Sequence, residues 1–229
     1  MTRTWTITDD CGNSTDCVQI FDFIDTTPPT ADCPPSPVEL IELPMDFSPT
    51  AVGPNTPQGS SIDPAITGSP TNVLDNCDAT PEVSYQDALE FLGPCDIPGD
   101  VVWQVTRTWT IVDNCGNPMQ CVQVFDFIDT TPPTTDCPPS PVELIEVPLD
   151  FNTIPVVTNT PQDPSIDPTI TGEPTNVQDN NPVAPAVDYQ DVLEFIGACN
   201  VPGEAIWQVT RTWTIADGCG NLITCEQVF

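Results

Sequence analysis

Apolar and polar residues alternate most clearly over residues 101–111. Alternation with a period of two is typical of a β-strand that is buried on one face. The apolar positions are Trp103, Val105, Trp109 and Ile111, and mostly Thr and Gln lie between them. Residues 113–117 contain Asn and Gly, which favour turns, and Cys121 to Ile128 then resume an apolar pattern. We therefore predict a β-hairpin that ends near residue 128.

Further strands are predicted upstream of this hairpin, at Val38 to Leu43 and at Val83 to Phe91. The segment from Ser48 to Asn72 is dense in Pro, Gly, Ser, Thr and Asn, which predicts long loops with short edge strands. Helix signals are almost absent. About a hundred residues of strands and turns favour an all-β sandwich of the immunoglobulin-like kind.

The hairpin phrase Thr-Arg-Thr-Trp-Thr-Ile occurs three times, starting at Thr2, Thr106 and Thr210, with a period of 104 residues. A period of this length is the size of a whole domain rather than of a solenoid repeat. The segment Asp-Thr-Thr-Pro-Pro also recurs, at 25–29 and 129–133, and its two prolines stiffen it as a linker. We expect tandem immunoglobulin-like sandwiches: residues 1–29 are the terminal hairpin and linker of a preceding, truncated repeat, 30–133 a complete repeat, and 134–229 a second repeat truncated at its last strand.

Composition narrows the class of protein. Three basic side chains stand against 34 acidic ones, which gives a net charge of −31. This charge excludes nucleic acid as a partner and attracts divalent cations. Eleven cysteines without any His or Cys-x-x-Cys pair indicate disulfides, and with them an extracellular or cell-surface location. The sequence has no apolar run of membrane-spanning length, so we expect no membrane insertion.

The motif Thr-Arg-Thr-Trp-Thr-Ile-x-Asp-x-Cys-Gly-Asn, followed by a later Cys, Asp-Thr-Thr-Pro-Pro and Asp-Cys-Pro, resembles tandem HYR-like (hyalin repeat) modules. It is also similar to the repeats of very large surface adhesins of Bacteroidota. The resemblance covers nearly the whole chain except residues 48–72, which look like an insertion. It implies an immunoglobulin-like fold and a role in cell-surface stalks, adhesion or fibres, and it names no ligand.

The immunoglobulin-like strand order allows disulfides to be predicted. The first strand begins at the end of the domain where the last hairpin turns, so our preferred bonds are Cys33–Cys121 and Cys137–Cys225. Cys77 is placed at the same end as Cys115, although its counterpart in the next repeat is Asn181. Three alternatives stay open: Cys199–Cys219 within the second repeat, Cys95–Cys219 between repeats, and Cys115–Cys121 across the hairpin. We expect Cys11 and Cys17 to pair with a preceding repeat.

Oxygen-bearing side chains gather in the linkers and in the loops that face them, and such ligands suit Ca²⁺. At the first linker the predicted ligands are Asp22, Asp25, Asp75, Asn76, Asp78, Asp113 and Asn114. At the second they are Asp126, Asp129, Asp179, Asn180 and Asp217. The alternative is that these residues form turns and a solvated acidic surface.

The only cationic side chains are Arg3, Arg107 and Arg211, one in each Trp-bearing strand. We predict a structural role for them, either a bidentate pair with a carboxylate such as Asp87 or Asp191 or stacking on Trp. Three residues match short glycosylation signals: Thr26, Thr130 and Asn13.

Catalysis is not expected, because the sequence has no His, no Lys and no nucleophile-elbow or phosphate-binding motif. The favoured hypothesis is a segment of a repetitive extracellular stalk or filament, stabilised by disulfides and Ca²⁺, whose partners are neighbouring copies of the same repeat in an array or homopolymer. The alternative is an adhesin that binds glycans or proteins through the loops at 48–72.

Overall fold

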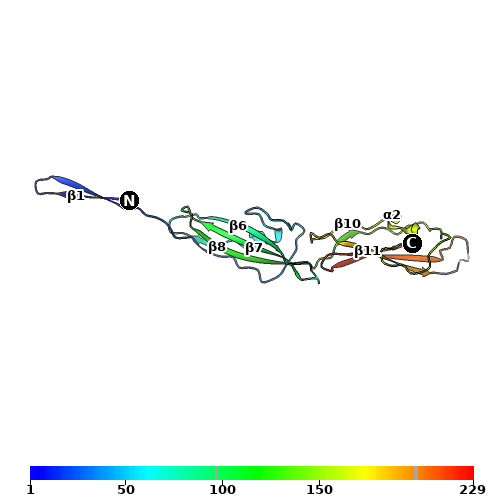
Figure 1. Ribbon diagram of the computed structural model, residues 1–229. Coiled ribbons are helices and arrows are strands. Elements are labelled where there is room, and N and C mark those ends of the chain that lie inside the picture. Colours follow the sequence, from blue (N-terminus) through cyan, green and yellow to red (C-terminus); the bar gives the residue numbers. More distant parts are fainter. Residues whose placement is uncertain (96, 199–200) are drawn as a thin grey trace.

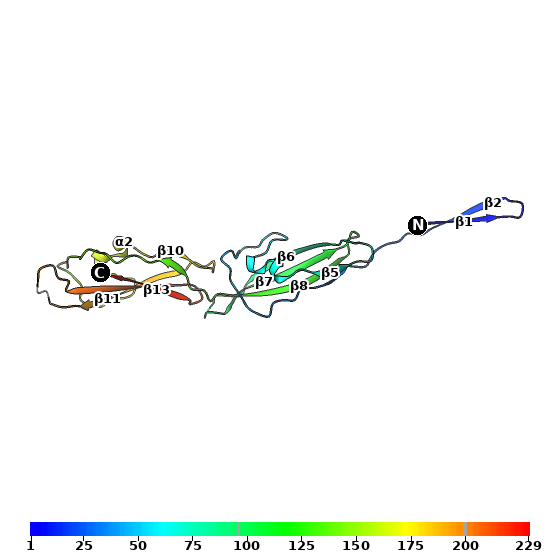
Figure 2. The same ribbon diagram turned by 180° about the vertical axis from the view of Figure 1, so that it is seen from behind.

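The computed structural model describes residues 1–95, 97–198 and 201–229. Three parts lie in a row: an N-terminal hairpin, a first unit (residues 30–133) and a second unit (residues 134–229) (Figures 1 and 2). Each hydrogen-bonded sheet lies within one part. The two short α-helices have four residues each, so the predicted all-β class is confirmed. The immunoglobulin-like assignment stays a prediction.

The N-terminal hairpin pairs β1 (Thr2–Thr8) with β2 (Ser14–Ile20) in antiparallel register, with Trp5 opposite Cys17. All residues of both strands are exposed. The same register recurs in the two units, where Trp109 faces Cys121 and Trp213 faces Cys225. The repeated sequence therefore forms the same hairpin at each of its three occurrences.

The first unit is built on a four-stranded sheet in the order β4-β8-β7-β6. Its strands are β4 (Ile41–Glu42), β6 (Glu82–Phe91), β7 (Val101–Val112) and β8 (Pro118–Ile128). A second layer pairs β3 (Thr30–Asp32) with β5 (Thr71–Leu74). The layers meet where Ala31 and Val73 pack against Tyr85, Trp109, Ile111 and Cys121.

The strand predicted at Val38 to Leu43 is only two residues long, Ile41–Glu42, so this prediction is mostly wrong. Prolines at positions 34, 35 and 37 remove backbone donors just before it, and Val38 is fully exposed. Next to these prolines a side chain, rather than a strand, pairs with the backbone of β8: the Val124 amide donates a hydrogen bond to Ser36 Oγ at 2.8 Å.

The predicted loop at 48–72 contains two short helical turns that the sequence reading missed, η1 (Ser60–Ile62) and α1 (Pro64–Thr67). Asp63 caps α1 by accepting a hydrogen bond from the Ala65 amide, and Pro64 occupies the first helical turn. Ile62 is fully buried against Val105 and Phe125. The segment is therefore part of the core rather than a free surface loop.

The second unit repeats these elements except β4, which has no counterpart in its described part. Its elements are β9 (Thr134–Asp136), η2 (Pro164–Ile166), α2 (Pro168–Thr171), β10 (Thr175–Gln178), β11 (Ala186–Phe195), β12 (Trp207–Ala216) and β13 (Leu222–Val228). Its main sheet therefore has the order β11-β12-β13. One end of the unit is more open. Leu43 is buried in the first unit, whereas its counterpart Val147 is 41% exposed beside a groove of about 480 Å³ lined by Phe151, Trp207 and Phe229, among others.

Candidate functional site

Each unit carries one internal disulfide, and both are the predicted ones. Cys33 is bonded to Cys121 with a Cα separation of 5.7 Å, and Cys137 is bonded to Cys225 with a separation of 5.8 Å. Cys33 directly follows β3, and Cys121 lies in β8. Each bond therefore ties the start of a unit to its last hairpin across a sequence separation of 88 residues. Such a bond contributes about 2–4 kcal/mol to stability.

A third disulfide joins the two units. Cys95, in the loop after β6, is bonded to Cys219 in the turn between β12 and β13, with a Cα separation of 4.5 Å. This resolves the alternatives for Cys219 in favour of the bond between repeats. Cys199, the other predicted partner, lies outside the described residues.

Among the cysteines that the structure describes, four are free and exposed: Cys11, Cys17, Cys77 and Cys115. The alternative bond Cys115–Cys121 is therefore wrong, because Cys121 is bonded to Cys33. As predicted, Cys77 and Cys115 lie in loops that meet at one end of the unit, where the Asn114 amide donates to Asp78, but both remain thiols.

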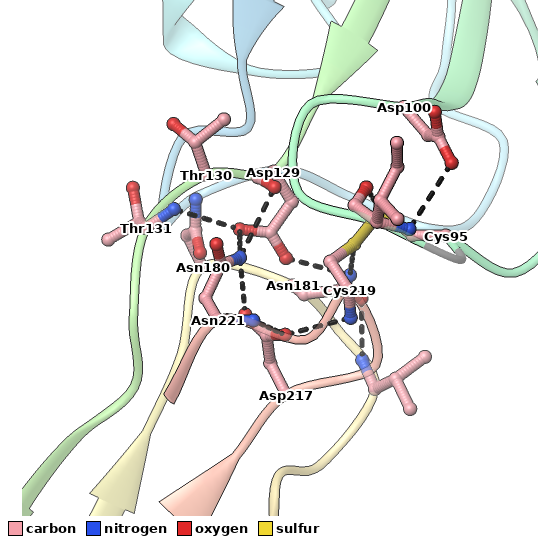
Figure 3. The surroundings of a disulfide bond; sticks show 12 residues. Cys95, Asp100, Asp129, Thr130, Thr131, Asn180, Asn181, Asp217, Cys219 and Asn221 are labelled. Atoms are coloured by element: carbon pink, nitrogen blue, oxygen red, sulfur yellow. Dashed lines mark hydrogen bonds between the residues drawn. A yellow bond between two sulfur atoms is a disulfide. The ribbon is translucent and has the colours of Figure 1, made fainter. Parts of the chain in front are cut away.

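The turn that carries Cys219 also forms hydrogen bonds with the linker between the units (Figure 3). Asp217 Oδ1 accepts hydrogen bonds from the amides of Cys219 and Asn221 at 2.8 and 2.9 Å. The Asn221 side chain donates to Asp217 Oδ2 at 2.7 Å and to the Asp129 carbonyl at 3.2 Å. The sequence motif Asp-x-Cys-Gly-Asn therefore builds a turn that reaches the neighbouring unit.

The same turn occurs in the first unit, where Asn117 donates to Asp113 at 2.7 Å and to the Asp25 carbonyl at 3.4 Å. Sequence reasoning missed both Asn117 and Asn221. The recurrence of Cys-Gly-Asn at all three copies was the signal that could have found them.

Carboxylates converge at each linker. Asp25, Asp75 and Asp113 form one group, and Asp129 and Asp217 form another beside the Cys219 sulfur; within each group the potential ligand atoms lie within 4.8 Å of one another. We call these two places the first joint and the second joint. At the second joint Asp129 is fully buried, and its Oδ2 accepts a hydrogen bond from Asn181 at 3.0 Å (Figure 3).

Asp179 is the counterpart of Asp75 at the second joint, and both of its carboxylate oxygens are buried without a well-formed hydrogen bond, although the backbone amides of Asn180 and Asn181 lie near enough to lower its pKa in part. Burial, together with the charges of Asp129 and Asp217, raises the pKa of Asp179 to about 6. Burial also raises the pKa of Asp129. Because the folded state binds the Asp179 proton more tightly than the unfolded chain does, ionisation of Asp179 opposes folding as the pH rises from 3.8 to about 6.

Glu42 forms a polar bridge between the units that the sequence did not reveal. Its carboxylate accepts hydrogen bonds from the Thr130 amide at 2.9 Å, the Thr130 and Thr131 hydroxyls at 2.8 Å, and the Asn180 side chain at 3.1 Å. Burial alone would raise the pKa of Glu42, but these hydrogen bonds lower it. The linker is thus held from both sides.

The other predicted ligands lie around the clusters or away from them. Asn76 donates to Asp25 Oδ1 at 3.2 Å, and the Asn114 amide donates to Asp78 at 3.0 Å. Asp126 accepts a hydrogen bond from Gln104 at 2.7 Å within the sheet, and Asp22 is exposed. The structure does not bring Asp22 or Asp126 into either group.

The residues with glycosylation signals differ in their surroundings. Thr26 is exposed. The Thr130 hydroxyl donates to Glu42, and the Asn13 side chain donates to Asp9 at 2.9 Å. Glycosylation at the three residues stays a prediction.

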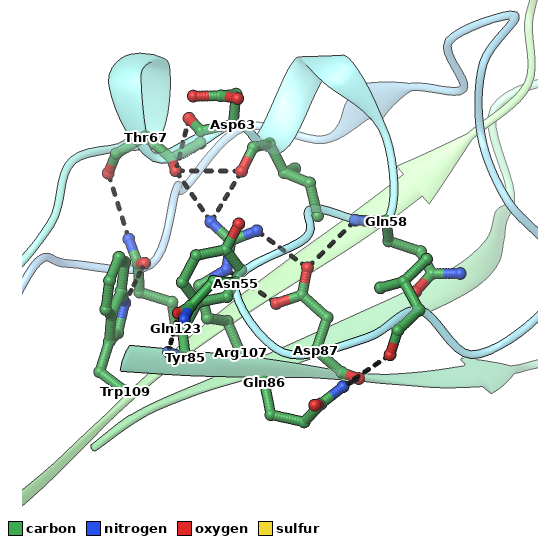
Figure 4. Close-up of polar contacts among 12 residues, drawn as sticks. Asn55, Gln58, Asp63, Thr67, Tyr85, Gln86, Asp87, Arg107, Trp109 and Gln123 are labelled. Carbon is green, nitrogen blue, oxygen red and sulfur yellow. Dashed lines mark hydrogen bonds and ion pairs between the residues drawn. The ribbon is translucent and has the colours of Figure 1, made fainter. Parts of the chain in front are cut away.

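The predicted arginine pairs are present in both units (Figure 4). Arg107 is bidentate to Asp87, with Nε–Oδ1 at 2.7 Å and Nη2–Oδ2 at 2.8 Å, and both side chains are fully buried. The guanidinium also donates to the Ile62 carbonyl at 2.7 Å and lies 4.3 Å from the centroid of the Tyr85 ring. Arg211 and Asp191 form the same pair.

The segment at 48–72 covers this ion pair. The Gln58 amide donates to Asp87 Oδ2 at 3.1 Å, and Gln123 links Trp109 Nε1 to the Thr67 carbonyl. The Arg107–Asp87 pair therefore ties the segment at 48–72 to the central sheet of the first unit, and in the second unit the Gln162 amide donates to Asp191 Oδ2 in the same way, at 2.9 Å.

No helix among the described residues is both long and apolar enough to cross a membrane. Comparison with models of known protein families finds none that matches this chain, and comparison with curated proteins finds no match either.

Proposed function

We propose that the chain is a spacer segment of a repetitive extracellular stalk or filament, in which each unit holds the next at a fixed angle, and that it has no catalytic role. One observation carries the proposal: the Cys95–Cys219 disulfide bonds two successive units to each other in addition to the linker. A covalent bond between neighbours is of direct use to a structural array and of no evident use to independent binding modules.

Two further features support this proposal. Glu42 and Asn221 hold the linker from opposite units, so the joint has polar contacts as well as a disulfide. Three disulfides are typical of an oxidising environment outside the cytosol.

An adhesin that binds glycans through residues 48–72 has less support. Gln58 and Ile62 of that segment use their backbone polar groups on the Arg107–Asp87 pair. A loop whose backbone is committed to the core has less freedom to adapt to a ligand.

Residual dipolar couplings of the oxidised chain test the proposal. A fixed joint predicts that one alignment tensor fits both units. In the double variant Cys95→Ser with Cys219→Ser we expect two different tensors, because the covalent tie is lost, whereas the control Cys77→Ser removes only a free thiol and should keep a single tensor. Two tensors in the unaltered oxidised chain, or specific glycan binding that is lost when residues 48–72 are altered, would contradict a spacer role.

A further inference from the structure

We infer that each joint is a Ca²⁺ site whose anionic ligands are three carboxylates, one from the linker and two from loops of the following unit. At the first joint they are Asp25, Asp75 and Asp113, whose carboxylate oxygens lie within 4.8 Å of one another. At the second joint they are Asp129 and Asp217, which meet the same limit, together with Asp179, the counterpart of Asp75. The proposal does not depend on the spacer role, because it concerns only what the joints bind.

Buried oxygen atoms without partners point to a missing ligand. At the first joint these atoms are Oδ2 of Asp25 and Oδ2 of Asp75. At the second joint both oxygens of Asp179 and Oδ1 of Asn180 have none. Asn180 is only 7% exposed, and its nitrogen already donates to Glu42 and to the Leu43 carbonyl at 2.9 Å. A buried acceptor without a donor destabilises the folded state, and a bound cation would remove that cost.

The charge at the joints is also uncompensated by the protein. Arg107 and Arg211 are buried in pairs with Asp87 and Asp191, and Arg3 lies in the N-terminal hairpin. These three are the only basic side chains of the sequence. Buried carboxylates close to one another need either protons or a cation, so the counter-charge at neutral pH has to come from solution.

At the second joint the donor set selects Ca²⁺ among common metals. The unpartnered atoms at the joints are all carboxylate or amide oxygens, which are hard ligands. The Cys219 sulfur is in a disulfide and offers no thiolate, and the sequence has no His, so the second joint lacks the ligands that zinc prefers. Ligands from separate segments give an irregular cage, which Ca²⁺ tolerates better than Mg²⁺ does.

Isothermal titration of the oxidised, chelator-treated chain with CaCl₂ tests the site. We expect two ions per chain with a Kd on the order of 10⁻⁴ M, the range of extracellular calcium modules. Asp179→Asn should remove one ion, and Asp179→Asn with Asp75→Asn should remove both. Asp150→Asn, which alters an exposed aspartate outside the joints, should leave both ions bound and controls for non-specific attraction to the acidic surface.

Circular dichroism of every variant checks that it is folded, so that a loss of binding is not a loss of structure. Binding that is unchanged in the double variant, or equal heats with MgCl₂, would overturn the assignment. Weak binding that the control Asp150→Asn reduces as much as Asp179→Asn does would show surface attraction only and would also overturn it.

Discussion

Replacing Asp87 with Ala is expected to lower the free energy of unfolding of the first unit by about 3–5 kcal/mol, because it leaves Arg107 charged and buried without its carboxylate. The Arg107 guanidinium is fully buried, so water cannot replace the lost partner. The loss is a large fraction of the stability of an ordinary domain, about 5–15 kcal/mol. Differential scanning calorimetry of the disulfide-intact chain measures it as a lower melting temperature of one unit.

Matched variants separate the ion pair from general effects. Glu90→Gln changes an exposed carboxylate in the same strand and should alter stability by less than about 0.5 kcal/mol. Asp191→Ala should destabilise the second unit in the same way. Replacing both partners, Asp87→Leu with Arg107→Met, should recover much of the loss, since no unpaired charge remains. A change below about 1 kcal/mol for Asp87→Ala would show that the pair does not hold the unit together.

Stretching the oxidised chain from its two ends is expected to extend it far less than stretching the reduced chain. The bonds Cys33–Cys121 and Cys137–Cys225 each bridge 88 residues, so tension passes through sulfur and bypasses the interior of each unit. Reduction should release about 300 Å of extra length per unit when the chain unfolds. Single-molecule force spectroscopy with and without a thiol reductant measures this length directly.

The disulfide between units makes a sharper prediction for the same measurement. In the variant Cys137→Ser with Cys225→Ser, the Cys95–Cys219 bond still bypasses most of the second unit when the chain is pulled from its ends. The fully extended length of this variant should therefore exceed that of the unaltered oxidised chain by only about 50 Å. Replacing Cys95 and Cys219 with Ser as well should release most of the 300 Å. Cys11→Ser with Cys17→Ser is the control and should change nothing. A full-length gain from the first variant alone would exclude a bond between the units.

The correct predictions from the sequence depend on regular patterns, namely alternation along a strand and the order of adjacent strands. The alternation around Trp109 predicted β7, and strand order placed Cys33 near Cys121. Each repeat has a single arginine, and few carboxylates lie close to it in the predicted sheet. In the first unit the cross-strand neighbour of Arg107 is Asp87. These features depend on local period and on pairing between adjacent strands.

What the sequence did not reveal depends on contacts between distant segments. Glu42 binds Thr130 across 88 residues, and no local pattern marks such a pair. The turn α1 has only four residues, too few for a helical period, although Asp63-Pro64 is a capping signal. Asp22 and Asp126 are near the joints in sequence. Asp126 lies in β8, where alternation along the strand decides which way its side chain points, whereas Asp22 lies beyond the end of β2 and is exposed.

The bonded joint has a geometric consequence for a longer array. Applying one fixed rotation and one fixed translation again and again generates a screw, so identical joints throughout such an array would produce a filament of constant pitch. Its handedness would be set by the angle at which Cys95 meets Cys219 rather than by any property of a unit alone.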